Sequence, residues 1–160
     1  DRPVFSPLSI PFNNVEQSSV YTRTLIINGV EQDIEFTALS MGNPHAVIIV
    51  ENLDNTAVKD IGEALGKHTD FPEGVNVGFV QIESKNEIKL RVFERGAGET
   101  LACGTGACAA VAAGCLRGLL GDTVKVNLLG GQLTINWQQG DSPVLMTGPV
   151  KTVYEGTIEL

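Results

Sequence analysis

The sequence is poor in basic residues. Its 11 lysines and arginines are outnumbered by 19 aspartates and glutamates, so the formal net charge of the 160 residues is −8. A protein that binds nucleic acid needs clustered lysine and arginine side chains to neutralise phosphates. The chain has no such cluster, so the composition excludes nucleic acid as the partner.

Long apolar runs are also absent. The longest, 46–50 and 107–115, are shorter than the roughly 20 residues that cross a bilayer. We therefore expect no membrane segment, and no stretch has the pattern of a signal peptide. The first residue is Asp1 rather than methionine, and the opening residues resemble the middle of a chain, so we expect a fragment of a longer protein.

Cysteine is scarce and confined to one segment. Cys103, Cys108 and Cys115 all fall in one predicted helix, where residues seven apart are separated by about 10 Å along the axis. That separation excludes a disulfide between them, and the absence of a C-x-x-C pair gives no zinc site. We predict that Cys108 and Cys115 are small buried hydrophobes, and we expect a reducing, cytoplasmic compartment.

Hydrophobic residues make up 42% of the sequence and charged residues 19%, which is typical of a soluble globular chain with one core or two small lobes. An Asn28-Gly29 turn between two β-branched runs predicts a hairpin. Spacing of Val58, Ile61 and Leu65 predicts a short amphipathic helix, capped by Asn55 or Thr56. The segments predicted as strands are 23–27, 34–39, 46–51, 75–83, 88–94, 124–129, 133–137, 144–146 and 153–158.

A second predicted helix runs from Gly104 to about Leu120. It carries almost no charge except Arg117, and its alanines and glycines occur on every face, which is typical of a helix buried all round. Strands outnumber helices on both sides of it. We therefore predict an α+β fold in which a curved antiparallel or mixed sheet, barrel-like in shape, wraps around this helix. A helix sandwiched between a sheet and another layer would explain the same pattern.

The segment 94–110 places Cys103 between a glycine-rich turn and a helix start. Gly96, Gly98, Gly104 and Gly106 let the backbone approach a ligand and adopt positive φ. Free N–H groups at a helix N-terminus favour anions. We therefore expect this site to stabilise either a thiolate at Cys103 or a bound carboxylate.

Two motifs carry a family resemblance: M-G-N-P-H at 41–45 and E-R-G-A-G-E-T-L-A-C-G-T-G-A-C-A at 94–109. Together with 71–79, the turn near Gly130 and 146–150, they resemble the C-terminal half of the diaminopimelate epimerases, a family of cofactor-independent racemases. The resemblance implies an isomerase that interconverts LL- and meso-diaminopimelate, on the route to lysine and peptidoglycan precursor, without pyridoxal phosphate or metal.

In that family one cysteine removes the α-proton as a thiolate, and a second, protonated cysteine delivers a proton to the opposite face. Each half of the molecule contributes one cysteine. Only Cys103 matches here, and the other motif, of C-G-N-G type, has no counterpart. The resemblance therefore implies that the chain needs a missing N-terminal half as its partner and is not competent alone.

The resemblance also suggests roles for the residues around Cys103. The backbone amides of Gly104 and Thr105 would hold the α-carboxylate, although simple helix capping would also explain these residues. Arg95 would bind the distal carboxylate with help from Asn43 and Asn76, although a surface role is the ordinary one for an arginine.

Two further side chains are predicted to adjust the acidity of the cysteines. Glu94 would accept a hydrogen bond from the substrate ammonium or raise the basicity of the thiol, and His45 would tune the partner cysteine across the cleft. A structural role would also explain a histidine after Asn-Pro.

The resemblance further divides the chain into a catalytic and substrate-binding lobe, 1–148, and a terminal segment, 149–160, whose strands return to the missing lobe. It also suggests a homodimer, with Tyr154 at the subunit contact.

Three other functions can be compared with this one. A nucleotide-binding loop fits poorly, because no lysine follows the glycines and neither phosphate-binding spacing is present. A cysteine hydrolase would use Cys103 with His45 as its base. A non-catalytic binding or dimerisation lobe would retain the cysteine without using it.

Overall fold

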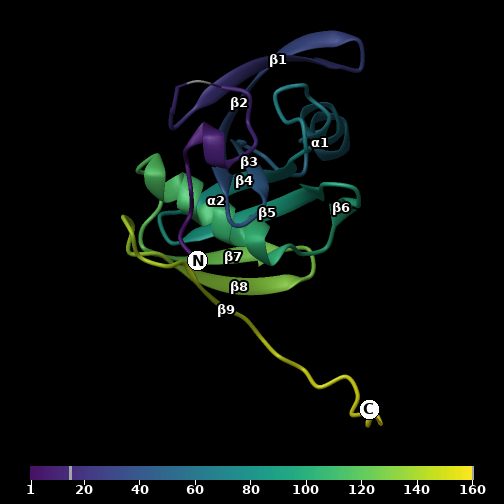
Figure 1. The fold of residues 1–160 in the computed structure, drawn as a ribbon, viewed down its shortest axis with the longest axis vertical. Helices are drawn as coiled ribbons and strands as arrows, with labels where there is room; N and C mark the ends of the chain where they lie inside the picture. Colours follow the sequence, from purple (N-terminus) through teal and green to yellow (C-terminus); the bar gives the residue numbers. More distant parts are fainter. Residues whose placement is uncertain (15, 160) are drawn as a thin grey trace.

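The computed structural model describes residues 1–14 and 16–159. Within these residues a short 3-10 helix, two α-helices and nine strands are formed (Figure 1). In chain order they are η1 (Pro7–Ser9), β1 (Tyr21–Ile27), β2 (Val30–Ser40), β3 (Pro44–Ile49), α1 (Val58–Gly66), β4 (Asn76–Ser84), β5 (Glu87–Glu94), β6 (Gly98–Thr100), α2 (Gly104–Leu116), β7 (Thr123–Leu128), β8 (Gly131–Asn136) and β9 (Leu145–Thr147).

The strands form one mixed sheet in the order β1-β2-β3-β4-β5-β7-β8-β9, with β6 paired to β5 beside this path. The β3–β4 and β5–β7 pairs are parallel, and the other pairs are antiparallel. The predicted α+β class with a curved mixed sheet is confirmed. The sheet stays open rather than closing as a barrel, because the edge strands β1 and β9 lie at opposite ends of the body (Figure 1).

The predicted hairpin is formed by β1 and β2. Its turn residues Asn28 and Gly29 have φ of 51° and 81°, the left-handed values that a two-residue turn with matching twist requires. Ile27 pairs with Val30 directly across the turn. For this reason β2 begins several residues earlier than the predicted strand 34–39.

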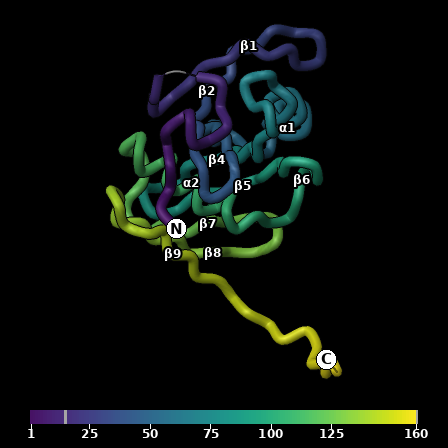
Figure 2. The backbone as a smooth tube through the Cα atoms, viewed as in Figure 1, coloured from purple at the N-terminus to yellow at the C-terminus, as the bar shows by residue number. Residues whose placement is uncertain are grey.

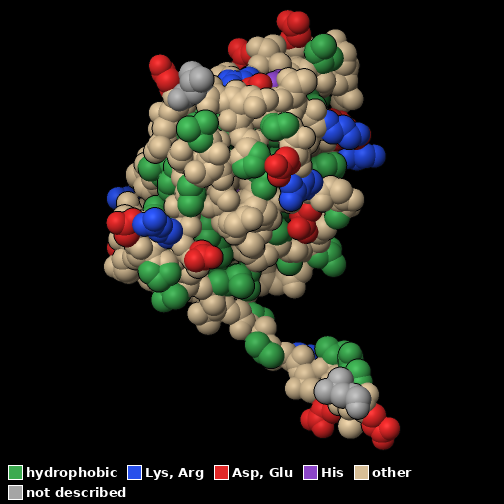
Figure 3. Space-filling view, in the orientation of Figure 1, with side chains coloured by type: hydrophobic (Ala, Val, Ile, Leu, Met, Phe, Trp, Pro, Cys, Tyr) green, Lys and Arg blue, Asp and Glu red, His purple; other side chains and the backbone are tan. Residues whose placement is uncertain are grey.

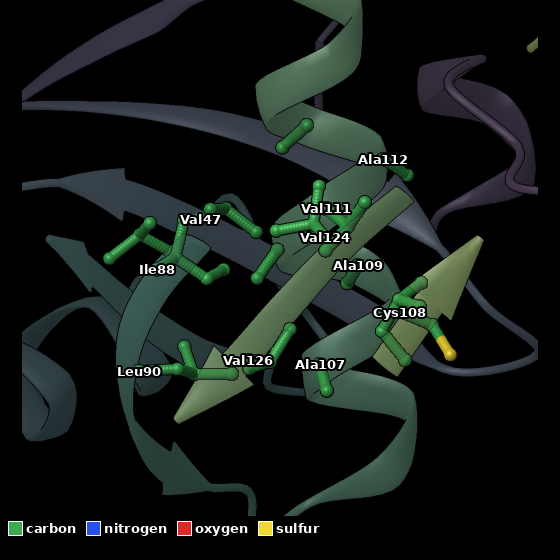
Figure 4. Close-up of a cluster of buried hydrophobic side chains, with 14 of the residues drawn as sticks. Val47, Ile88, Leu90, Ala107, Cys108, Ala109, Val111, Ala112, Val124 and Val126 are labelled. Atoms are coloured by element: carbon green, nitrogen blue, oxygen red, sulfur yellow. The ribbon is translucent and has the colours of Figure 1, made fainter. Parts of the chain in front are cut away.

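Helix α2 is buried, as predicted. Every residue from Gly106 to Cys115 is buried, and the close-up shows side chains of β3, β5 and β7 converging on the helix (Figure 4). Small residues are needed for this packing, since a Cβ on Gly114 would lie 2.3 Å from Leu120 Cδ1. The helix ends at Leu116 rather than near Leu120, because Gly118, with φ of 69°, turns the chain back so that Leu120 covers Gly114.

The opposite face of the sheet covers a second core. Val47 of β3 belongs to the cluster around α2, whereas its neighbours Ala46 and Ile48 belong to a cluster shared with α1 and several aromatic side chains. The aromatic members of this second cluster are Phe12, Tyr21, Phe36, Phe71 and Phe79. Because the first five residues of β3 and of β4 are buried on both faces, their sequences are mostly apolar runs, whereas β5 alternates between buried and more exposed residues.

Helix α1 begins at Val58 as the spacing predicts, but its predicted cap is wrong. The residue before the helix is Ala57, and no side chain caps the helix. The Thr56 hydroxyl donates instead to the carbonyl of Asn52, at 2.6 Å. The two described α-helices are both too short to cross a bilayer.

Residues 148–159 have no regular secondary structure and extend away from the body (Figure 2). The predicted strand 153–158 is therefore wrong for the chain by itself, since none of the described strands pairs with this segment. Its side chains Val150, Val153, Tyr154 and Ile158 are all at least 80% exposed. The space-filling view shows apolar side chains along this segment, and interspersed acidic and basic side chains on the body (Figure 3).

Candidate active site

Cys103 is the residue immediately before α2. Its backbone is extended, with φ of −139° and ψ of 113°, and its side chain is buried, with 8% of the residue exposed. The chain reaches it from β5 through the glycine turn and β6. A Cβ on Gly106 would lie 3.2 Å from Cys103 Cβ and 3.3 Å from its sulfur, so glycine at 106 makes the room that the thiol occupies.

The sulfur of Cys103 lies among donors and one carboxylate. Its Sγ is 3.6 Å from Thr105 Oγ1. Burial raises the pKa of the Cys103 thiol; hydrogen bonds from Thr105 and from the Gly106 N–H act in the opposite direction, and the carboxylate of Glu94 adds to the increase. The expected stabilisation of a thiolate by the helix start is therefore outweighed by desolvation, and the thiol is the favoured form.

Glu94 ends β5 and is half-buried beside the thiol. The hydroxyl of Thr100 donates to Glu94 Oε1 at 2.5 Å. Thr100 lies on β6, which folds back along β5 through Gly96 and Gly98, both with positive φ. The glycine turn therefore supplies a side chain that orients the carboxylate.

The M-G-N-P-H motif forms the turn from β2 into β3. Its histidine, His45, is 1% exposed, and burial lowers the pKa of this imidazole to about 4; Glu94 partly offsets the decrease and Arg95 adds to it. The ring is therefore neutral near pH 7. Its Nε2–H donates to Asn43 Oδ1 at 3.0 Å.

Asn43 connects this motif to the helix start. Its Nδ2 donates to Thr105 Oγ1 at 3.5 Å. Since Thr105 also contacts the Cys103 sulfur, the two motifs that the sequence singled out meet at Thr105, although they lie far apart in the chain.

Asn76 is 4% exposed and joins two other parts of the site. Its Nδ2 donates to the carbonyl of Pro44, and its Oδ1 accepts from the backbone N–H of Arg95, both at 3.0 Å. The side chain therefore holds the start of β3 against the turn that follows β5. Its role in binding substrate stays a prediction.

The Arg95 guanidinium lies at the surface. Its Nη1 donates to the carbonyl of Glu73 at 2.9 Å, and its stem packs on Gly74, where a Cβ would lie 3.1 Å from Arg95 Cδ. It forms no ion pair with an acidic side chain of the described residues. Its remaining N–H groups are available to a carboxylate, which they can bind through two parallel hydrogen bonds.

The start of α2 carries unused donors. No side chain caps the helix, and the N–H groups of Gly104 and Thr105 have no hydrogen-bond acceptor within the described part of the chain. Such N–H groups favour an anion at the helix N-terminus. Among the described residues no group of three or more His, Cys, Asp or Glu side chains is arranged to hold a metal ion.

The other two cysteines are buried along α2, as predicted, and all three are free. Burial raises the pKa of both thiols, for Cys115 to about 11 with a smaller contribution from Asp122. Cys115 Sγ also lies 3.3 Å from the Gly121 carbonyl. Tyr154 lies in the extended segment and is 84% exposed, away from the residues around Cys103.

Three functional neighbours were missed by the sequence reasoning: Thr100, Glu73 and Gly106 as an N–H donor. Thr100 could have been predicted if the glycine turn had been interpreted as the turn of a hairpin between β5 and β6, because the second strand of such a hairpin returns alongside Glu94. The contact between Glu73 and Arg95 is made through a carbonyl group, which leaves no signal in the side-chain sequence.

An open curved sheet around a buried helix is a fold shared with solved structures. One is a hydroxyproline epimerase from Agrobacterium vitis with bound trans-4-hydroxy-L-proline, at a TM-score of 0.52 and 22% identity over 75% of this chain and 42% of that one. Another is a PhzF-family phenazine biosynthesis protein from Enterococcus faecalis, at a TM-score of 0.50 and 15% identity over 75% and 40%. These likenesses define the fold class.

The family follows from sequence. A family model described as diaminopimelate epimerase matches residues 37–153. Curated relatives of that name are 50% identical in Teredinibacter turnerae and 52% identical in Nitrosomonas europaea, over 99% of this chain and 56% of each relative. The chain belongs to the diaminopimelate epimerase family, and it spans little more than half the length of these relatives.

Proposed function

We propose that the chain is the C-terminal half of a diaminopimelate epimerase and that, with the remaining half, it interconverts LL- and meso-2,6-diaminopimelate. The observation that carries the proposal is the buried Cys103 thiol at the start of α2, next to two free backbone donors and inside the segment that the family model matches. The reaction would belong to lysine and peptidoglycan precursor biosynthesis and would need no pyridoxal phosphate.

The proposed chemistry transfers protons at the α-carbon. A second cysteine, supplied by the remaining half, takes the α-proton as a thiolate, and the electron pair delocalises into the α-carboxylate. The S–H bond of Cys103 then breaks as its proton adds to the opposite face. The raised pKa of Cys103 supports this starting role as the acid, and the reverse reaction exchanges the roles of the two sulfurs.

The carboxylates of the substrate would be bound by donors on two elements. The N–H groups of Gly104 and Thr105 are suited to stabilise the charge that develops on the α-carboxylate. Arg95 would bind the distal carboxylate, with the amides of Asn43 and Asn76 nearby. The free guanidinium N–H groups of Arg95 favour this assignment.

Glu94 and His45 would set the proton affinity of the cysteines. Glu94 would accept a hydrogen bond from the Cys103 thiol or from the substrate ammonium, and the hydrogen bond from Thr100 would keep its carboxylate oriented. His45 would act on the cysteine of the remaining half as a neutral imidazole, because its pKa of about 4 leaves it uncharged at neutral pH.

A cysteine hydrolase is not favoured by this arrangement. Such an enzyme needs its histidine within hydrogen-bond reach of the nucleophile. His45 instead bonds to Asn43 and reaches the sulfur only through Asn43 and Thr105. A non-catalytic lobe would have no need of the free donors at Gly104 and Thr105.

Assembly and compartment belong to the same proposal. The three free thiols support a reducing, cytoplasmic compartment. We propose that 149–160 forms strands on the remaining half and that the complete protein is a homodimer with Tyr154 at the subunit contact. The exposed apolar side chains of this segment support a partner there.

The proposal is tested by α-proton exchange. LL-diaminopimelate is incubated in deuterated reducing buffer with this chain, with and without the N-terminal half, and NMR follows loss of the α-proton signal. We expect exchange only when both halves are present, and none with Cys103→Ala. Absence of exchange from the associated halves would contradict the proposal.

A further inference from the structure

Three contacts connect His45 to the Cys103 sulfur through Asn43 and Thr105. The Nε2–H of His45 donates to Asn43 Oδ1 at 3.0 Å, which fixes the orientation of the amide. The amide Nδ2 then donates to Thr105 Oγ1 at 3.5 Å. Because the hydroxyl oxygen already accepts this bond, its own hydrogen is left for another acceptor, and Cys103 Sγ lies 3.6 Å away.

We propose that His45 and Asn43 are positioning residues that direct the Thr105 hydroxyl hydrogen at the Cys103 sulfur. This inference rests on the proposed use of Cys103 as a proton-transfer group, and it deepens that function. The hydroxyl would stabilise the thiolate left after the thiol gives up its proton. The carboxylate of Glu94, which raises the pKa of the same thiol, would accept the S–H hydrogen, so the thiol and thiolate forms would each have a partner.

The position of His45 makes it suited to this role. It is 1% exposed, and its ring is held on β3 beside Asn76 of β4. Thr105, by contrast, is exposed, and a threonine hydroxyl at a surface rotates freely. A rigid, buried donor at one end of the chain of contacts would therefore restrict a mobile hydroxyl at the other end.

The electrostatic surroundings of the sulfur come from three elements. Glu94 ends β5 and Arg95 follows it, His45 lies on β3, and Cys108 lies on α2. Any change in the ionisation of Cys103 must be separated from changes in these groups. We therefore compare each variant with and without the Thr105 hydroxyl. An effect transmitted through Asn43 and Thr105 disappears when this hydroxyl is removed, whereas a direct electrostatic effect on the sulfur remains.

The test measures ionisation of Cys103 in the 160-residue chain without substrate. The rate of alkylation by iodoacetamide is recorded against pH, and fragmentation mass spectrometry assigns the label to each cysteine. Thr105→Val should lower the thiolate fraction of Cys103 by about tenfold, the size expected when a charged group loses one hydrogen bond. Thr105→Ser retains the hydroxyl and should keep the original thiolate fraction of Cys103. Thr24→Val removes another exposed hydroxyl and should leave this fraction unchanged.

The decisive comparison concerns His45. His45→Phe removes the donor and should shift the Cys103 profile in the same direction as Thr105→Val, whereas His45→Gln, which retains an N–H donor, should keep most of the original profile. In the Thr105→Val background His45→Phe should add nothing. The proposal would be overturned if His45→Phe shifted the Cys103 alkylation profile equally with and without the Thr105 hydroxyl, or did not shift it at all.

Two further readouts keep the test independent of folding and of the proposed reaction. If circular dichroism shows that His45→Phe is unfolded, Asn43→Asp replaces it. The new carboxylate would accept the Thr105 hydroxyl hydrogen, so Asn43→Asp should suppress the thiolate more strongly in the original chain than in the Thr105→Val background. A parallel change in labelling of Cys108 would indicate general opening and count against the proposal. The alkylation measurements contain no substrate, so they test the positioning role of His45 and Asn43 even if the α-proton exchange assay fails.

Discussion

Gly106 links the packing of α2 to the chemistry of the thiol. In Gly106→Ala the new Cβ would lie 3.2 Å from Cys103 Cβ, 3.3 Å from its sulfur and 3.4 Å from Val92 Cγ2. Ordinary carbon contacts are about 3.5–4.0 Å, so the thiol must move by a few tenths of an ångström. Alanine gains up to about 1 kcal/mol of helix propensity over glycine, whereas overpacking costs about 1–3 kcal/mol.

We therefore expect Gly106→Ala to remain folded, with a loss of unfolding free energy of no more than about 2 kcal/mol. With the N-terminal half present, proton exchange should fall by roughly 10- to 100-fold because the sulfur is displaced. Urea unfolding and the NMR exchange assay measure the two effects. The control is Gly66→Ala in α1, where a Cβ would meet only the Val75 carbonyl oxygen, at 3.6 Å. This variant should leave proton exchange unchanged. Normal exchange in Gly106→Ala would refute the reasoning.

The remaining predictions concern the cysteines, His45 and the extended segment. Cys103→Ala should abolish exchange, while Cys108→Ala and Cys115→Ala should each cost about 1 kcal/mol or less in unfolding free energy; equal loss of exchange in all three variants would contradict the assignment. The pKa of His45 is 6.5 when unfolded and about 4 when folded, so the unfolded state binds more protons between these values. The free energy of unfolding should therefore fall as pH drops from 6.5 to 4, and His45→Gln should flatten that part of the urea-unfolding profile relative to the original chain. The chain by itself should self-associate through 148–159, and a monodisperse monomer in light scattering would argue against this.

The sequence was most informative where local chemistry determines the structure. Asn28-Gly29 specified a hairpin because few residues accept positive φ at both turn positions. The small, uncharged residues of α2 specified burial on all sides. The predicted strands 46–51 and 88–94 correspond to β3 (Pro44–Ile49) and β5 (Glu87–Glu94), with bounds that differ by at most two residues.

Other features depend on contacts between distant segments and could not be predicted in this way. The Asn76 side chain forms hydrogen bonds with the backbone of Pro44 and of Arg95, which lie in different parts of the chain. The Thr56 hydroxyl was expected at a helix cap but bonds to the Asn52 carbonyl. In each case the choice between two hydrogen-bond partners is made by tertiary packing, which the residue type alone does not encode.

The ionisation of Cys103 also depends on tertiary packing, and it affects the proposed proton transfer. A helix start stabilises a thiolate, but the same location buries the sulfur, and burial has the larger effect on the pKa. A carboxylate bound to the Gly104 and Thr105 amides would add negative charge beside the sulfur and favour the thiol further. Cys103 would therefore enter the reaction as the acid, and the base would come from the half that this chain lacks.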